Sequence, residues 1–172
     1  MDSRRAFYIG RFQPYHLGHQ FVLENIARDV DEIIIGIGSA QASHEQNNLF
    51  TAGERVLMMT KALEELVIKH YIIPIEDIQR NSVWVSHVIS LTPPFNVVYS
   101  NNPLVICLFN EAGFEVRQSP LFLREQYSGT QIRHRMRTGE EWKSLVPPST
   151  FNVIKEIGGV ERLKMISNKD SV

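Results

Sequence analysis

The sequence predicts an α/β fold in which one parallel sheet is covered by helices on both faces. Five short apolar runs alternate with longer segments of helical periodicity. Runs that are apolar at nearly every position are typical of strands that are buried on both faces. This alternation predicts a Rossmann-like, doubly wound parallel sheet of about five strands, followed by C-terminal helices.

The predicted elements follow one another along the chain. Strands are expected at residues 6–10, 32–38, 70–75, 96–100 and 114–118. Helices are expected at residues 18–29 and 51–66, from residue 81 or 82 to before residue 93, and from 102 to 113. Further helices are expected after the fifth strand, at residues 130–137 and 149–157 and from residue 160 onward.

Capping residues support the helix boundaries. Thr51 and Glu54 match a capping box at the start of the second helix. Asn81 or Ser82 is expected to cap the third helix, because short polar side chains accept the unpaired N–H groups of a first turn. Asn102, followed by a proline, is expected to cap the fourth helix.

Composition limits the classes of function. The 172 residues are expected to form a single domain, 1–172, with a C-terminal helical extension over about 130–167. The 18 Lys and Arg and 19 Asp and Glu give a formal charge of −1, which favours neither a nucleic-acid nor a membrane partner. The single cysteine, Cys107, excludes an intramolecular disulfide and, with no apolar run of membrane-spanning length, predicts a cytoplasmic protein.

The first candidate site is the segment "GRFQPYHLGH", residues 10–19. Gly10 ends the first predicted strand, and ligands of such folds bind at the carboxyl ends of the strands. His16 and His19 are three residues apart, so both can face one ligand. A zinc site needs three or four ligands, and a pair of half-exposed loop histidines is the alternative. Together with Arg11 and a helix N-terminus, the pair suits a site for developing negative charge.

The second candidate site is "YSGTQIRHRM", residues 127–136. Ser128 and Gln131 match a capping box, which indicates an ordinary helix start. The hydroxyl of Thr130, the free amides of the helix N-terminus and Arg133 add the features of an anion site. The chain lacks the usual glycine-rich nucleotide motifs, so these two segments are the candidate phosphate sites.

The two segments resemble the H-x-G-H and S-x-T-x-x-R signatures of the nucleotidyltransferase superfamily. The longer blocks "GRFQPYHLGH", "IGSAQASH", "FTAGER", "SLTPPF", "YSGTQIRHRM" and "GVERL" are similar to the archaeal type of nicotinamide-nucleotide adenylyltransferase. The resemblance covers about residues 6–164. It implies that the chain joins nicotinamide mononucleotide (NMN) to the adenylyl group of ATP, giving NAD and pyrophosphate.

The resemblance also implies roles for residues of both segments. His16 and His19 would contact the ATP phosphates and stabilise the transition state, and Gly18 would let a phosphate approach the backbone. Ser128, Thr130 and Arg133 would hold the leaving phosphates. The residues implied in catalysis are His16, His19 and Arg133, and those implied in ATP and phosphate binding are Gly10, Arg11, Gly18, Ser128, Thr130 and Arg133. Mg²⁺ would arrive with ATP, with no metal ligand from protein side chains.

The block "EDIQRNSVWVSH", residues 76–87, would form the nicotinamide pocket. By resemblance, Trp84 would stack on the cationic ring, and Asp77 and Asn81 would lie near the carboxamide. From its neighbours alone, Val83 and Val85, Trp84 is as well explained as a core residue.

The resemblance leaves open which phosphorylated acceptor is used and whether the chain is an enzyme or a binding module. A related enzyme acting on another phosphorylated acceptor, or a non-catalytic NAD- or ATP-binding module, would use the same signatures. Relatives also form homo-oligomers, commonly hexamers. In the loop "HEQNNLF", residues 44–50, some relatives carry an arginine that this chain lacks.

Overall fold

The five predicted strands form one parallel sheet in the order β3-β2-β1-β4-β5. The strands are β1 (Arg5–Gly10), β2 (Glu32–Ile37), β3 (His70–Pro74), β4 (Val97–Tyr99) and β5 (Glu115–Arg117). The computed structural model describes residues 3–119 and 125–169. Each strand agrees with its predicted range to within one residue at either end, so the apolar runs predicted the sheet correctly.

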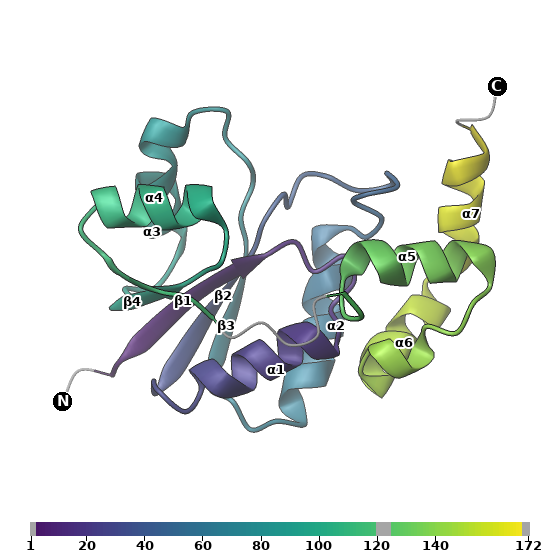
Figure 1. Cartoon of the computed structure of the whole chain (residues 1–172), viewed down its shortest axis with the longest axis horizontal. Helices are drawn as coiled ribbons and strands as arrows, with labels where there is room; N and C mark the ends of the chain where they lie inside the picture. The colour runs from purple at the N-terminus through teal and green to yellow at the C-terminus, as the bar shows by residue number, and fades with distance from the viewer. Residues whose placement is uncertain (1–2, 120–124, 170–172) are drawn as a thin grey trace.

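Alternating side chains of the strands supply two hydrophobic cores. In β2, Ile33 and Ile35 belong to the larger core, whereas Ile34 belongs to the smaller one on the opposite face. Helices α1 (Leu17–Ile26) and α2 (Ala52–Glu64) supply the larger core, and α3 (Trp84–Leu91) and α4 (Pro103–Glu111) the smaller one. Figure 1 shows these two pairs of helices on opposite sides of the sheet, as predicted for a doubly wound fold.

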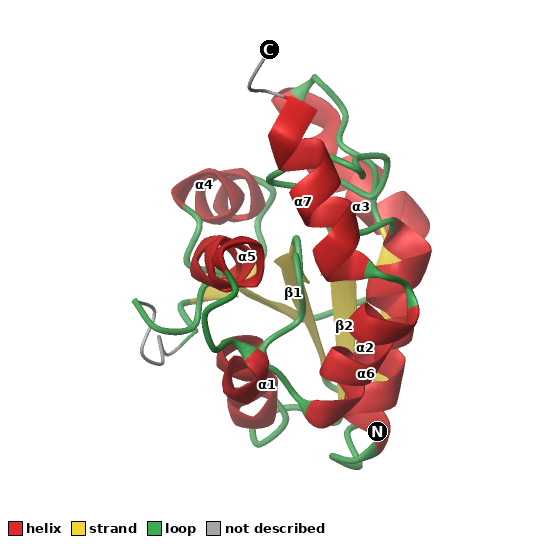
Figure 2. Ribbon diagram, turned by 90° about the vertical axis from the view of Figure 1, so that its right-hand side faces the viewer, coloured by secondary structure: helices red, strands yellow, loops and turns green. Residues whose placement is uncertain are grey.

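Three further helices follow the sheet: α5 (Gly129–Thr138), α6 (Pro148–Glu156) and α7 (Gly159–Lys169). A 3₁₀ turn, η2 (Lys143–Leu145), lies between α5 and α6. Helix α6 packs on α2, and α7 contacts both α5 and α6 (Figure 2). The C-terminal helices therefore extend the larger core beyond the edge of the sheet.

Most of the predicted helix ends are confirmed. The Thr51 hydroxyl accepts the Glu54 N–H and the Glu54 carboxylate accepts the Thr51 N–H, so the predicted capping box is present. Asn102 caps α4 through the N–H groups of Leu104 and Val105.

The predicted cap of the third helix was wrong. Residues Asn81–Val83 form a 3₁₀ turn, η1, and α3 begins only at Trp84. The N–H of Val83 donates to the Arg80 carbonyl and that of Trp84 to the Asn81 carbonyl. The main chain of the turn thus accepts these N–H groups, and neither the Asn81 nor the Ser82 side chain serves as the cap.

In the described ranges, no helix is long and apolar enough to cross a membrane.

Candidate active site

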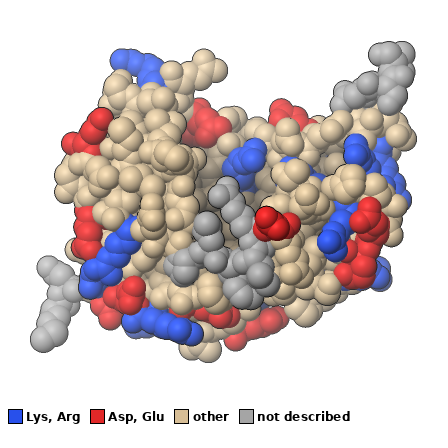
Figure 3. Space-filling model, viewed as in Figure 1, with Lys and Arg blue, Asp and Glu red and all other residues tan. Residues whose placement is uncertain are grey.

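The candidate site lies where the strand order of the sheet reverses. The chain leaves β1 toward β2 on one side, whereas β4 adds on the other side of β1. Ligands of open α/β sheets bind at such a switch point, outside the carboxyl ends of the strands. A cavity of about 640 Å³ is found there, and Figure 3 shows the surface hollowed between the α3–α4 side and the α5 side. Its size is typical of a small-molecule site.

The cavity brings together residues of both predicted phosphate segments. Its walls include Arg11, His16, Gly18, His19, Ser128, Thr130 and Arg133. The loop that follows β4 and the segment that follows β5 add Ser100, Asn101, Asn102 and Ser119. The two signatures are thus parts of one site.

Gly10 is outside the cavity walls and contributes through packing. A side chain at this position would place its Cβ 2.9 Å from the ring of Phe12. Phe12 is fully buried and has a positive φ of 52°, a conformation that is rare for an aromatic residue. Its ring contacts the His19 ring edge-on, with centroids 4.7 Å apart. Gly10 therefore makes room for the residue that supports His19.

His16 and His19 form a capping box with each other. His16 is the N-cap of α1, and its Nδ1 accepts the backbone N–H of His19 at 3.3 Å. The Nδ1 of His19 in turn accepts the backbone N–H of His16, also at 3.3 Å. Because both Nδ1 atoms are acceptors, each neutral ring carries its proton on Nε2. That Nε2–H is the group through which each ring can donate to a ligand.

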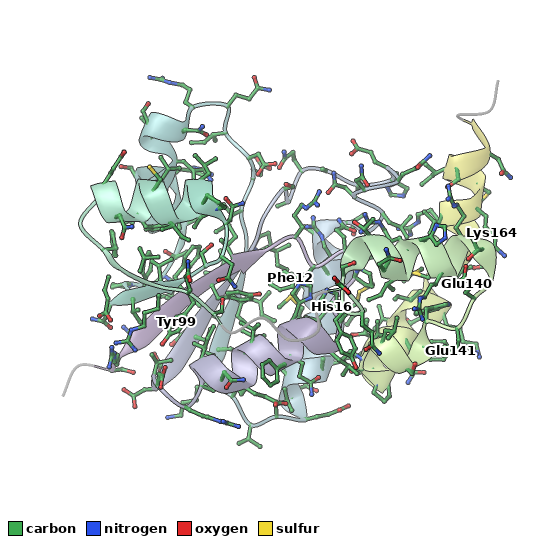
Figure 4. All side chains as sticks on the ribbon, viewed as in Figure 1. Phe12, His16, Tyr99, Glu140, Glu141 and Lys164 are labelled. Atoms are coloured by element: carbon green, nitrogen blue, oxygen red, sulfur yellow. The ribbon has the colours of Figure 1, made fainter. Side chains whose placement is uncertain are left out.

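The environment keeps both histidines neutral. Burial lowers the pKa of His16 to about 4. Burial, and next the neighbouring His16, hold the pKa of His19 well below its ordinary value. The two rings stack with centroids 3.6 Å apart, and Figure 4 shows His16 and Phe12 between α1 and α5. At neutral pH the pair therefore offers two neutral N–H donors.

The second signature begins α5 next to the histidines. The Ser128 hydroxyl accepts the N–H of Gln131 at 3.2 Å, which is the first half of the predicted capping box. Thr130 is exposed in the first turn, and both residues line the cavity. The positive end of the α5 dipole thus points its unpaired N–H groups at the site.

Arg133 is buried, with 6% of its surface exposed, and links three segments. Its Nε donates to the Gln46 carbonyl at 2.7 Å and its terminal nitrogens to the Gln13 carbonyl at 2.6 Å and to the Asn47 side chain at 3.3 Å. Burial and repulsion by Arg11 lower the pKa of Arg133 to about 10, so the guanidinium stays charged. The loop at residues 44–50 is thus bonded to an arginine of α5.

Arg55 is a residue that sequence analysis missed. It is fully buried on α2 and donates to four main-chain carbonyls, those of Thr51, Arg11, Gly38 and Ser39. Burial and then repulsion by Arg11 lower its pKa to about 10. Two signals could have found it: Arg55 ends the block "FTAGER", and its spacing places it on the buried face of α2 with Met58, Met59 and Ala62.

Gly18 lines the cavity, and the structure shows that it also has a packing role beside the phosphate contact expected of it. A Cβ at this position would lie 2.8 Å from the Cβ of Tyr127 and 3.0 Å from Nδ1 of His16. The missing side chain therefore makes room for the second signature and for the imidazole of the first. This close packing explains the glycine without a bound phosphate.

The three residues expected in the nicotinamide pocket lie outside the walls of this cavity. Asp77 follows β3, and its carboxylate and N–H both pair with the side chain of Gln41. Asn81 is exposed in η1. Trp84 is half-buried against the smaller core, with its ring nearly perpendicular to that of Phe109 at 5.6 Å. One part of the indole thus packs in the core while another part stays accessible.

The described residues contain no cluster of three or more His, Cys, Asp or Glu side chains suited to a metal ion. The described cavity wall also lacks carboxylates, the ligands that Mg²⁺ prefers in proteins. Its charged side chains are instead Arg11 and Arg133, so the site suits an anion such as a polyphosphate.

Comparison with known proteins agrees with this geometry. Residues 7–135 match the model of the cytidylyltransferase-like family. The chain is 65% identical to the nicotinamide-nucleotide adenylyltransferase of Methanolobus tindarius over 167 residues, or 97% of this chain and 96% of the relative. The corresponding protein of Methanosarcina barkeri is 64% identical, with the same shares covered.

A solved structure shows the same fold. It is a bifunctional NMN adenylyltransferase/ADP ribose pyrophosphatase from Francisella tularensis, complexed with AMP and a manganese ion. It superposes with a TM-score of 0.78 at 19% identity, over 97% of this chain and 53% of that one. Because the family model matches most of the chain and the archaeal relatives align with it over almost their whole length, the chain belongs to the cytidylyltransferase-like family and, within it, to the archaeal nicotinamide-nucleotide adenylyltransferases.

Proposed function

We propose that this protein joins NMN and ATP to form NAD and pyrophosphate, as an NMN adenylyltransferase of NAD biosynthesis. The observation that carries this proposal is the single cavity in which the two signatures meet, in a chain 65% identical to an enzyme of that name. The cavity offers neutral N–H donors, a guanidinium group and a helix N-terminus to one polyphosphate.

The proposed chemistry is an in-line displacement at the α-phosphorus of ATP. An oxygen of the NMN phosphate forms the new bond to this phosphorus, and the bond to the bridging oxygen of the β-phosphate breaks. The attacking phosphate is already ionised at neutral pH, so no base has to remove a proton. The rate then depends on alignment and on stabilising the charge of the transition state.

His16 and His19 would stabilise the reacting α-phosphate through their Nε2–H groups. Their capping box fixes the tautomer and orients the rings before ATP binds. Such preorganised donors need no rearrangement during the reaction. Arg11, the exposed cation at the cavity, would neutralise the reacting phosphates.

Ser128, Thr130 and Arg133 would hold the β- and γ-phosphates that leave as pyrophosphate. Each of the two terminal nitrogens of Arg133 donates one hydrogen bond within the protein, to Gln13 or to Asn47. Each nitrogen carries a second N–H, which would donate to phosphate oxygens. The amide N–H groups at the start of α5 add donors of the same kind.

Mg²⁺ is proposed to enter with ATP, bound to the phosphates. The absence of carboxylates among the described cavity residues supports this role over a site built from protein side chains. The metal would neutralise phosphate charge, while the side chains bind and orient the phosphates.

The nicotinamide end of NMN is proposed to lie beside Trp84, Asp77 and Asn81. Asp77 follows β3 at the carboxyl edge of the sheet, the same edge as the cavity, which supports this assignment. A cationic ring over the accessible part of the indole would gain about 1 to 2 kcal/mol from the cation–π contact.

The deciding experiment is an assay of the purified protein for NAD formation from NMN, ATP and Mg²⁺. Turnover is expected with NMN, and the deamido mononucleotide should be tested in parallel. Turnover only with another phosphorylated acceptor would favour a different nucleotidyltransferase. ATP binding without any turnover would favour a nucleotide-binding module.

Three further expectations belong to the same proposal: one domain over residues 1–172, a cytoplasmic location and a homo-oligomer such as a hexamer. Light scattering of the purified protein tests the last of these.

A further inference from the structure

Gln13 lies between the catalytic histidines and β1 but has no role in the proposed chemistry. It is 3% exposed, and its side chain pairs with the backbone of Phe50 in both directions. Its Oε1 accepts the Phe50 N–H at 2.8 Å, and its Nε2 donates to the Phe50 carbonyl at 2.9 Å. A buried amide that makes two such bonds fixes the distance between its own loop and the loop at residues 44–50.

The backbone of the same residue contacts the second signature. The Gln13 carbonyl accepts the 2.6 Å hydrogen bond from Arg133, which lies 120 positions later in the chain. Arg133 also donates to Gln46 and Asn47 in the loop at residues 44–50. Gln13, the loop and α5 therefore form a closed set of contacts, in which Gln13 is bonded to both other members.

Two glycines allow the signatures to approach this closely. A Cβ on Gly129 would lie 2.8 Å from the Gln13 carbonyl oxygen, a distance that real Cβ atoms essentially never show. On the other side of the contact, a Cβ on Gly18 would meet the Cβ of Tyr127, also at 2.8 Å. The two phosphate-binding segments are thus in direct contact with little space to shift.

We propose that Gln13 is a positioning residue that sets the spacing between the histidine pair and the phosphate-binding start of α5. This inference rests on the proposed function, because that spacing matters only if one polyphosphate spans both segments. His16 and His19 would then meet the reacting phosphate while Arg133 holds the leaving phosphates, at a distance fixed by the Gln13–Phe50 pair. A misplacement of about 1 Å can cost about 100-fold in rate.

The test replaces Gln13 by methionine, which keeps the approximate volume but removes both hydrogen bonds. The control is Gln20→Met on α1, where the side chain bonds only to Glu24 among the contacts described. For Gln13→Met we expect kcat to fall at least tenfold and the Kd of inorganic pyrophosphate, measured by calorimetry, to rise at least fivefold. The KM for NMN should change less than threefold, and Gln20→Met should match the wild type.

The outcomes separate positioning from simple stabilisation. A folded Gln13→Met protein with wild-type kcat and pyrophosphate affinity, and only a lower Tm, would overturn the proposal. If this variant does not fold, Gly129→Ala tests the same spacing from the other side, because its Cβ would push against the Gln13 carbonyl. We expect the same loss of kcat and pyrophosphate affinity, and unchanged values would refute a role for the spacing.

The experiment also distinguishes this inference from the proposed function. If the wild type makes NAD and Gln13→Met is equally active and binds pyrophosphate equally well, the inference fails and the function stands. If the wild type makes no NAD, the function fails, and the pyrophosphate titration of the variants alone decides the role of Gln13.

Discussion

The imidazole of His16 caps the helix that carries His19, and the imidazole of His19 accepts the backbone N–H of His16. The two rings stack 3.6 Å apart as a result. One structural device, a capping box, thus sets the tautomer and the orientation of both groups. Capping and the proposed catalytic role are therefore combined in the same two side chains, and substitution can separate them.

Substitutions of His16 should separate the two roles. His16→Asn keeps a side chain that can cap α1 but removes the Nε2–H donor, so kcat should fall about 100-fold or more, the usual effect of removing one such donor. His16→Ala removes both, so it should lose a similar factor in kcat and about 1 kcal/mol more in the free energy of unfolding. Steady-state kinetics and urea unfolding measure these quantities. Near wild-type kcat in His16→Asn would mean that His16 serves as a cap only.

The stability of the protein should fall as the pH is lowered from about 6.5 to about 4. In this window the unfolded chain binds a proton at His16, whose ordinary pKa is about 6.5, whereas burial keeps the folded group neutral down to about 4. Since the unfolded state binds more protons, acid favours unfolding, by up to about 3 kcal/mol for His16 alone. Urea unfolding at several pH values measures this slope, which is the change in the free energy of unfolding with pH.

Two variants check the assignment of this slope. His16→Asn should make the free energy of unfolding depend less on pH, but a smaller dependence should remain, because burial also holds the pKa of His19 well below its ordinary value. His134→Asn is the control for replacing an exposed histidine, because the side chain of His134 is 50% exposed. Equal slopes in the wild type and His16→Asn would contradict the assignment.

Arg55→Lys should reduce both stability and ATP binding. A lysine cannot supply the planar fork that reaches the carbonyls of Arg11, Gly38 and Ser39 together, so buried acceptors lose their partners. We expect a loss of about 2 kcal/mol or more in the free energy of unfolding. The KM for ATP should also rise, because the loop of Arg11 loses its support.

Arg28→Lys is the matched control for this substitution, since Arg28 is exposed. It should change neither Tm nor the KM for ATP. A stable Arg55→Lys protein with a wild-type KM for ATP would show that the four hydrogen bonds do not hold the Arg11 loop in place.

The sheet and the place of its active edge were predictable from local patterns. The run "EIIIGIG" is apolar after its first residue because β2 is covered on both faces, and the glycine at the end of β1 marked the edge that carries the histidines. The convergence of the two signatures followed from their resemblance to known motifs and from the parallel topology, which brings the strand ends together.

The supports of the site were not predictable in this way. Gln13 and Arg55 donate to main-chain carbonyls of distant loops, and a carbonyl has no counterpart in the sequence that would reveal the pairing. His16 was also unexpected as a cap, because the usual N-cap residues are Ser, Thr, Asp and Asn. The packing role of Gly18 was not foreseen either, because the side chains of Tyr127 and His16 that a Cβ would meet come together only in the folded chain.

Trp84 provides the test of the nicotinamide assignment, because its core packing and its proposed stacking make different predictions. Trp84→Phe keeps an aromatic face but weakens the cation–π contact, so the KM for NMN should rise modestly, by a factor of a few. Trp84→Ala removes the ring and should raise this KM about tenfold or more, with a smaller change in the KM for ATP. Trp84→Ala also removes the contact with Phe109, so its Tm should fall.

Phe109→Leu is the control, because it disturbs the same contact from the core side. It should also lower Tm, but it should leave the KM for NMN nearly unchanged. Trp84→Ala could instead raise the KM for NMN and the KM for ATP equally, or Phe109→Leu could raise the KM for NMN as much as Trp84→Ala does. Either result would mean that the indole acts through packing and that another residue stacks on the nicotinamide ring.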